Sequence, residues 1–133
     1  MIGSAHHVGI AVQRLDLAID RYRAFGLVLD YVEEVPAAGV RVAFLKAGGV
    51  QVELVEPLGS DSPVARFLAR RGEGLHHLAF AVEDIAAELV RLEKLGFDPV
   101  DRAPRPGARG RKVAFLQPRS AHGVLIELVQ EPR

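Results

Sequence analysis

An internal duplication constrains this sequence more than any other feature. Three segments from the first half of the 133-residue chain recur in the second half in the same order. They are His-Val-Gly-Ile-Ala-Val at 7–12 and His-Leu-Ala-Phe-Ala-Val at 77–82, Val-Ala-Phe-Leu at 42–45 and 113–116, and Glu-Leu-Val at 53–55 and 127–129. Repeats that keep their order predict two copies of one structural unit.

Each copy is expected to fold in the order βαβββ. Short apolar or alternating runs predict strands, and apolar residues at helical spacing predict one helix per copy. The expected elements are strands 6–12, 27–35, 40–47 and 50–57 with a helix at 14–25, then strands 75–82, 97–101, 112–117 and 123–129 with a helix at 84–95. We therefore predict a single α+β domain over residues 1–133, with repeats at about 5–58 and 74–130.

Capping residues mark the expected helices. Asp84 stands at the N-cap of helix 84–95, and Ser62 followed by Pro63 predicts a short linker helix at about 62–71. Gly26 is expected to end helix 14–25. The apolar face predicted for that helix consists of Leu15, Ala18, Ile19, Tyr22 and Phe25.

The composition limits the partners and the chemistry. The formal net charge is zero, so neither a nucleic acid nor a membrane surface is expected as a partner. Because the chain has no cysteine, any metal site must use histidine, aspartate, glutamate or glutamine. No stretch approaches the roughly 20 apolar residues of a membrane span, and the N-terminus has no basic region followed by an apolar run, so a cytoplasmic protein is expected.

Strand alternation surrounds each repeated histidine with small side chains. His7 is expected to share a strand face with Gly9 and Ala11, and the second copy places alanine at both equivalent positions beside His77. The bulky residues of both strands point to the opposite face, where the helix of each copy is expected to pack. Each histidine should therefore face a cavity.

Each copy also carries a glutamate within a predicted strand, Glu53 in the first and Glu127 in the second. A carboxylate buried without a partner costs several kcal/mol, so each should meet a cation or hydrogen-bond donors. If a pseudo-two-fold axis relates the copies, His7, Glu53, His77 and Glu127 come together as ligands of a divalent first-row metal. The alternative is a duplicated core hairpin in which each histidine merely pairs with its glutamate.

The other three histidines are not expected to bind the metal. His6 and His76 precede the repeated histidines, so strand alternation sends them to the opposite face, where they should pack or form hydrogen bonds. His122 precedes a glycine in the last hairpin loop and is expected in solvent.

Residues 102–112 carry five positive charges and no acidic residue. One interpretation is a solvated loop. The other is a mobile edge that grips an anionic tail, such as that of a phosphorylated cofactor, for which arginines are well suited. The candidate cofactor-binding residues are Arg105, Arg109, Arg111 and Lys112.

Motifs spread over the whole chain point to a known family. They are residues 7–12, Val52-Glu-Leu-Val-Glu-Pro-Leu-Gly-Ser-Asp-Ser-Pro63 followed by Phe67-Leu68, Gly72-Glu-Gly-Leu-His-His77, Gly107-Ala-Arg-Gly-Arg-Lys-Val-Ala-Phe-Leu116, and Gly123-Val-Leu-Ile-Glu-Leu128. Together with the duplication, they resemble the vicinal oxygen chelate superfamily, which includes glyoxalase I, and within it the methylmalonyl-CoA epimerase family. This resemblance implies duplicated βαβββ modules that form a curved mixed sheet around a metal site.

The resemblance also implies a function. Members of the epimerase family interconvert the two epimers of methylmalonyl-CoA by 1,1-proton transfer through a metal-stabilised enolate. For this chain it implies an acyl-CoA substrate, a homodimer, and a divalent metal bound by His7, Glu53, His77 and Glu127. Cobalt is the expected metal, with manganese, nickel or zinc as alternatives.

The acid–base groups are less clearly marked in the sequence. Epimerisation needs one such group on each side of the enolate. Some family members carry an acidic residue in the third strand, at the place that Val42 occupies here. Glu127 is therefore the candidate for one side, with Glu53 or a metal-bound water for the other. The alternative functions are a glyoxalase I-type lactoylglutathione lyase and a metal-free small-molecule-binding protein of the same fold.

Overall fold

The computed structural model describes residues 1–133, which divide into two compact units. The first unit comprises His7–His76, and the second comprises Met1–His6 together with His77–Arg133. Strands β1 (Ile2–Ala11) and β5 (Gly74–Val82) each contribute residues to both units. None of the α-helices has both the length and the apolar character that crossing a membrane requires.

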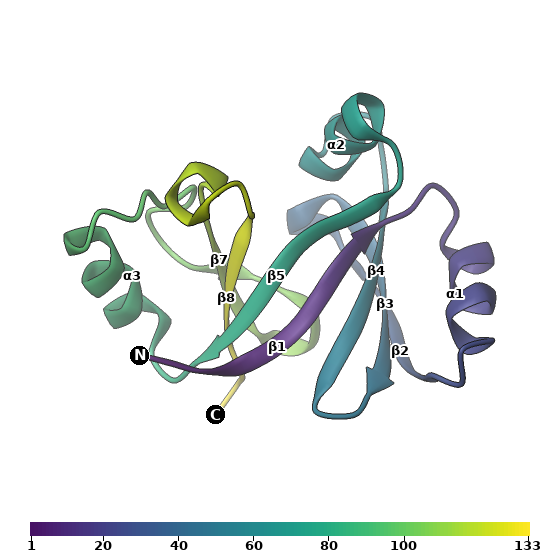
Figure 1. Ribbon diagram of the computed structural model, residues 1–133, viewed down its shortest axis with the longest axis horizontal. Coiled ribbons are helices and arrows are strands. Elements are labelled where there is room, and N and C mark those ends of the chain that lie inside the picture. The colour runs from purple at the N-terminus through teal and green to yellow at the C-terminus, as the bar shows by residue number, and fades with distance from the viewer. The chain divides into compact units, whose positions relative to one another are not determined.

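The first unit contains a mixed sheet in the order β2-β3-β4-β1. Its β1 segment runs parallel to β4, while β3 is antiparallel to both β2 and β4. Helix α1 packs beside β2, β3 and β4 (Figure 1). The elements after β1 are α1 (Leu15–Arg23), β2 (Val28–Val35), a short 3-10 helix (Pro36–Ala38), β3 (Val40–Ala47), β4 (Val50–Pro57) and α2 (Pro63–Arg71).

The second unit repeats this arrangement with the strand order β5-β8-β7-β6. Strand β5 runs parallel to β8, and β7 is antiparallel to both β8 and β6. Helix α3 packs beside β7 and β8 (Figure 1). The elements after β5 are α3 (Ile85–Lys94), β6 (Arg105–Pro106), a 3-10 helix (Ala108–Gly110), β7 (Lys112–Leu116), a 3-10 helix (Pro118–Ala121) and β8 (Ile126–Gln130).

Each helix covers the strand face that the sequence marks as bulky. In the first unit, Leu15 of α1 belongs to a core with Leu45 and Leu54, against which Ile10 packs. The second unit forms the equivalent core under α3. Its buried members are Val82, Ile85, Leu89, Leu92, Ala114, Leu116, Ile126 and Leu128. The helices therefore leave the opposite face of each sheet to the histidines.

The predicted strand at 97–101 is wrong. The structure has only an isolated bridge between Pro99 and Leu116 there, and the short strand β6 follows at Arg105–Pro106. The bridge has its two backbone hydrogen bonds, from Val100 N–H to the Phe115 carbonyl and from Gln117 N–H to the Asp98 carbonyl, both at 2.8 Å. The ladder stops there because the Phe115 backbone N–H donates to the Asp101 carboxylate at 3.1 Å, and not to the Val100 carbonyl that a continued antiparallel ladder would use.

Three other boundaries differ from the sequence prediction by two residues or more, and the first is the start of β1, which lies at Ile2 and not at residue 6. Strand β8 begins at Ile126 rather than at residue 123, because His122 and Gly123 both adopt positive φ angles. Helix α1 ends at Arg23, and Phe25 is 73% exposed, so its assignment to the buried face is wrong. The Phe25 ring meets the Tyr22 ring edge to face, at 5.5 Å between centroids, before Gly26 turns the chain.

The predicted caps of α2 and α3 are confirmed. The Ser62 hydroxyl accepts a hydrogen bond from Ala65 N–H, and the Asp84 carboxylate accepts one from Ala87 N–H, both at 3.1 Å. Arg14 is the repeat-equivalent of Asp84, but it makes no side-chain cap to α1. The two copies therefore differ in how their helices begin.

We predict that Asp84→Ala lowers the free energy of unfolding by about 1 kcal/mol, because one N–H at the start of α3 loses its acceptor. The matched control is Arg14→Ala, which removes only an exposed ion pair with Asp16 and should cost less than about 0.5 kcal/mol. Urea denaturation of both variants measures the difference. Equal losses would contradict the capping role.

Candidate functional site

The first unit buries a histidine against a glutamate. His7 lies on β1 and Glu53 on β4, where Glu53 stands opposite Gly9 in the parallel ladder. The His7 Nε2 atom is 3.2 Å from the Glu53 Oε1 atom, and the side chains are 3% and 12% exposed. The absence of a side chain at Gly9 gives the carboxylate room to reach the imidazole.

The second unit builds the same pair from equivalent positions. His77 lies on β5, and Glu127 on β8 stands opposite Ala79 in the parallel ladder. The His77 Nε2 atom is 3.0 Å from the Glu127 Oε1 atom, and the side chains are 4% and 9% exposed. The structure therefore buries all four residues that the sequence singled out, one pair within each unit.

A phenylalanine holds each pair in place. Phe44 on β3 is the antiparallel neighbour of Glu53, and its ring meets His7 edge to face at 5.2 Å between centroids. Phe115 on β7 is the neighbour of Glu127 and meets His77 in the same way at 5.8 Å. These contacts restrict the orientation of both imidazole rings.

The donor atoms suit a metal ion. Each pair offers an imidazole nitrogen and a carboxylate oxygen, which are ligands that first-row divalent metals accept. A buried carboxylate also needs a positive or hydrogen-bonding partner, and a cation meets that need. A neutral imidazole can occupy the same coordination shell without adding charge. The chemistry of each pair therefore fits a divalent metal.

The other histidines occupy the positions that alternation predicts. His6 Nε2 lies 3.6 Å from a carboxylate oxygen of Glu131, and the His76 ring packs edge to face on Phe67. His122 is exposed in the loop before β8, as predicted. The interpretation of His6 and His76 as packing or hydrogen-bonding residues is confirmed.

The basic loop at 102–112 is more engaged with acidic groups than its composition suggests. Arg105 Nε lies 3.0 Å from Asp101 Oδ1. Arg111 is largely buried and its Nε donates to both carboxylate oxygens of Glu131. Lys112 is exposed at the start of β7. The acidic partners lie just outside the loop or in the C-terminal segment, so a charge count within the loop could not find them.

The ion pair of Arg111 affects the titration of Glu131. Burial alone would raise the pKa of this carboxyl group. The hydrogen bond and positive charge of Arg111, together with His6, outweigh burial and hold the pKa of Glu131 below its ordinary value. The carboxylate form of Glu131 is therefore favoured in the folded chain.

The sequence did not single out two side chains of β2 that share the face of His7. Tyr31 stacks on Phe44 at 4.9 Å between ring centroids, and Glu33 stands opposite Val42 in the β2–β3 ladder. Strand alternation alone does not reveal them, because a register shift separates Leu29 from Tyr31. The close turn at 36–39 could have revealed the direction of Glu33, because it pairs Val35 with Val40 and thereby sets the register of the two strands.

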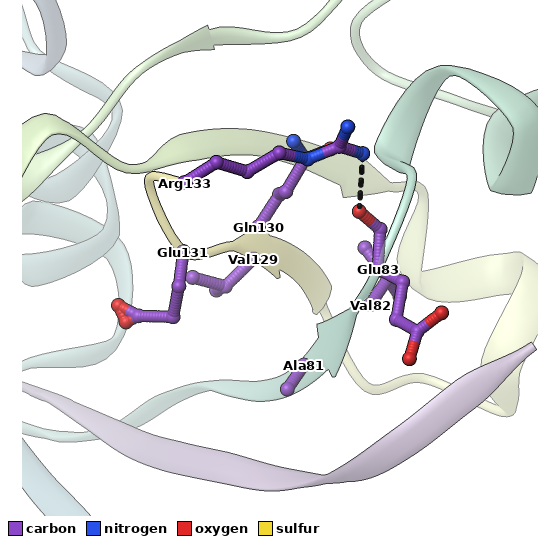
Figure 2. Close-up of a pocket in the computed structure, with 7 residues that line it drawn as sticks. All are labelled: Ala81, Val82, Glu83, Val129, Gln130, Glu131 and Arg133. Carbon is purple, nitrogen blue, oxygen red and sulfur yellow. Dashed lines mark hydrogen bonds between the residues drawn. The ribbon is translucent and has the colours of Figure 1, made fainter.

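A separate open pocket of about 390 Å³ lies at the ends of β5 and β8 (Figure 2). Arg133 crosses it and donates a hydrogen bond to the Glu83 carbonyl at 3.5 Å, while the Gln130 side-chain oxygen accepts from Ile85 N–H. Its lining residues are Ala81, Val82, Glu83, Val129, Gln130, Glu131 and Arg133. Neither His77 nor Glu127 lines this pocket.

Comparisons with known proteins identify the class. Residues 6–115 match the Glyoxalase/Bleomycin resistance protein/Dioxygenase superfamily, and the chain belongs to it. The chain is 39% identical to the ethylmalonyl-CoA/methylmalonyl-CoA epimerase of Cereibacter sphaeroides, over 98% of this chain and 99% of that protein. It is also 44% identical to an uncharacterized protein, YqjC, of Bacillus subtilis, over 93% of this chain and 89% of that protein.

A solved structure extends the comparison. A variant of Streptomyces coelicolor methylmalonyl-CoA epimerase, in complex with 2-nitronate-propionyl-CoA, superposes with a TM-score of 0.96. The two sequences are 36% identical, and the match covers 100% of both chains. These similarities confirm the resemblance inferred from the motifs, and they confirm the predicted α+β fold of duplicated βαβββ modules.

We predict that Arg111→Gln lowers the free energy of unfolding by about 1 kcal/mol near neutral pH, because Glu131 loses its charged partner while remaining half exposed. The folded-state pKa of Glu131 is depressed, so this stabilisation is present above the unfolded-state pKa and is lost as the pH falls through the folded-state pKa. The difference from wild type should therefore shrink in acid.

Urea denaturation at about pH 7 and about pH 3.5 tests this pH dependence. Arg102→Gln is the matched control, because it removes the same charge from an exposed position of the same loop. If Arg111→Gln lowers the free energy of unfolding by the same amount at both pH values, the stabilisation does not depend on the ionisation of Glu131 and the prediction is wrong.

Proposed function

We propose that this chain is an enzyme that interconverts the two epimers of methylmalonyl-CoA. The observation that carries the proposal is a match over nearly the full length, to the Cereibacter enzyme in sequence and to the Streptomyces enzyme in structure. The similarity leaves no large segment of those proteins unmatched. Each unit of this chain also contributes a buried histidine–glutamate pair of the kind that metal-assisted proton chemistry requires.

We further propose that the two pairs together hold one divalent metal. The support is the duplication itself, which gives His7 and His77 equivalent surroundings and does the same for Glu53 and Glu127. Two carboxylates and two neutral imidazoles balance the charge of a divalent cation. Cobalt is the first choice, with manganese, nickel or zinc as alternatives. When bound, such a cation stabilises negative charge on substrate oxygens, an effect of several kcal/mol.

The protein's own groups must then move the proton. The α-carbon of the substrate lies between a thioester and a carboxylate, so its proton is unusually acidic and the resulting negative charge is delocalised. We assign Glu127 to one side of this carbon and Glu53 to the other, each as an acid–base group that contributes about 10²–10⁴-fold. Both glutamates are also proposed ligands, and binding to a cation lowers the basicity of a carboxylate.

The rest of the substrate is a phosphorylated CoA chain. We propose that residues 102–112 contact its phosphates through Arg105, Arg109, Arg111 and Lys112. The support is their shared positive charge and the exposure of Lys112 at the start of β7. Arg105 and Arg111 already have carboxylate partners, so phosphate would compete with Asp101 and Glu131 for them. We also propose a homodimer and a cytoplasmic location.

Solvent exchange tests the reaction. The metal-loaded enzyme, incubated in heavy water with a single epimer of methylmalonyl-CoA, should place deuterium at the α-carbon and produce the other epimer, because the removed proton is replaced from solvent. Mass spectrometry and chiral analysis measure the two outcomes. Absence of exchange would sink the proposal, and turnover of methylglyoxal with glutathione would favour a lactoylglutathione lyase instead.

Two alanine variants at adjacent histidines, His77 and His76, test the metal site. We predict that His77→Ala reduces bound metal from about one ion per chain to less than about 0.1 and lowers turnover by at least about 100-fold, because an imidazole ligand is lost. His76→Ala is the matched control, since its ring packs on Phe67, away from the proposed ligands. Elemental analysis and exchange assays report both properties, and full metal content in His77→Ala would contradict the assignment.

A further inference from the structure

The registers of the first sheet place Glu33 on the same face as the His7–Glu53 pair. Residues directly opposite each other in an antiparallel ladder point to the same side of a sheet. Glu53 is opposite Phe44, and Phe44 is opposite Tyr31. Glu33 lies two residues beyond Tyr31, opposite Val42, and therefore projects to that side.

The exposure of β2 agrees with this direction. Glu33 is half-buried, whereas its neighbours Val32 and Glu34 are exposed. Glu34 points to the other face, where it pairs with Arg41 at 3.4 Å. Tyr31, on the side of Glu33, is only 8% exposed. The carboxylate of Glu33 thus borders a layer of side chains that extends through Tyr31 and Phe44 to His7.

Besides Glu53, the carboxylates of two β2 residues reach this face of the first sheet, Glu33 and Asp30. Asp30 is exposed at the bulge of β2, and its carboxylate accepts a hydrogen bond from Gln51 at 3.1 Å, opposite His7. The other titratable residues that the registers place there are His7, Tyr31 and Lys46. Lys46 is exposed near the end of β3 and carries a positive charge. The neighbouring positions toward the 3-10 helix are Val35, Val40 and Val55, which have no proton to exchange.

The second unit has no carboxylate at the equivalent position. Val113 corresponds to Val42 in the repeat, and the residue opposite it is Arg105. A guanidinium group keeps its proton at any ordinary pH and cannot act as a base. The two copies have therefore diverged at this position, and only the first offers an acid–base group there.

Spacing is compatible with a substrate between the two glutamates. Glu33 and Glu53 are separated by two strand spacings and by two residues along the strands, which amounts to about 12 Å between Cα atoms in a regular sheet. Both side chains lie on one face, with Val42 and Phe44 on the strand between them, so a substrate that both carboxylates approach would lie over those two residues.

We propose that Glu33 is the acid–base group for one face of the substrate α-carbon, taking the catalytic role assigned above to Glu53, which then serves only as a ligand. This inference rests on the proposed epimerase function. With one epimer, the α C–H bond breaks, its proton passes to a Glu33 carboxylate oxygen, and its electron pair is delocalised as the enolate. Glu127, the group proposed above for the other side of the α-carbon, then donates a proton from its carboxyl group to form the new C–H bond. The other epimer follows the reverse course, and the Glu33 carboxyl group donates its proton.

The test compares Glu33→Gln with Glu34→Gln in heavy water, starting from each epimer separately. Glu34 is the matched control because it is the adjacent glutamate on the opposite face. Glu33→Gln should lose exchange and epimerisation by about 10²–10⁴-fold from one epimer. From the other epimer it should still incorporate deuterium, while epimerisation is lost. Glu34→Gln should behave as wild type, and metal content should be normal in both variants.

The outcomes separate this inference from the function on which it rests. Absence of exchange in the wild-type enzyme overturns the epimerase proposal itself. Exchange in wild type together with unchanged Glu33→Gln, or with equal loss from both epimers, overturns only the assignment of Glu33. Glu33→Asp provides a second variant that keeps the carboxylate but shortens it. It should slow exchange from the same epimer more than from the other, and equal slowing would also overturn the assignment.

Discussion

Burial of a carboxylate beside an imidazole is the interaction around which each half of this protein is arranged. An ionised carboxyl group leaves water at a high free-energy cost, and several features of the fold reduce that cost. Glycine or alanine on the neighbouring strand leaves space, a histidine lies within about 3 Å, and a phenylalanine fixes the ring. The helix packs on the other face, so apolar burial is kept apart from the polar pair. The separation follows directly from the two-residue period of a strand.

The buried histidine–glutamate pairs could be predicted from the sequence because the same pattern of residues occurs in both repeats. A lone histidine in an apolar strand is ambiguous, but recurrence of His, Glu and their small neighbours in the same order made Glu53 and Glu127 stand out. The same argument identified the faces of β1 and β5 and the positions of His6 and His76. Helix caps such as Asp84 were equally predictable, since they depend on a few adjacent residues.

The errors arose where long-range contacts decide the local structure. The repeat predicts a strand at 97–101, yet only one bridge forms there, because the side chain of Asp101 takes the hydrogen bond that would continue the ladder. The sequence suggested that Arg111 has no acidic partner and could bind a phosphate, because its partner Glu131 is 20 residues away along the chain. Glu33 went unnoticed because its direction depends on the β2–β3 register, including a shift that no residue pattern marks.

Asp101 also joins two parts of the second unit that have different tasks. One of its carboxylate oxygens accepts the Phe115 N–H, and the other meets the guanidinium of Arg105. Phe115 in turn supports the ring of His77. The side chain of Asp101 therefore contacts both Arg105 of the charged loop and the backbone of Phe115, whose ring packs on the proposed ligand His77. An anion that binds Arg105 must compete for the guanidinium with Asp101, whose other oxygen holds the backbone of the residue that packs on His77.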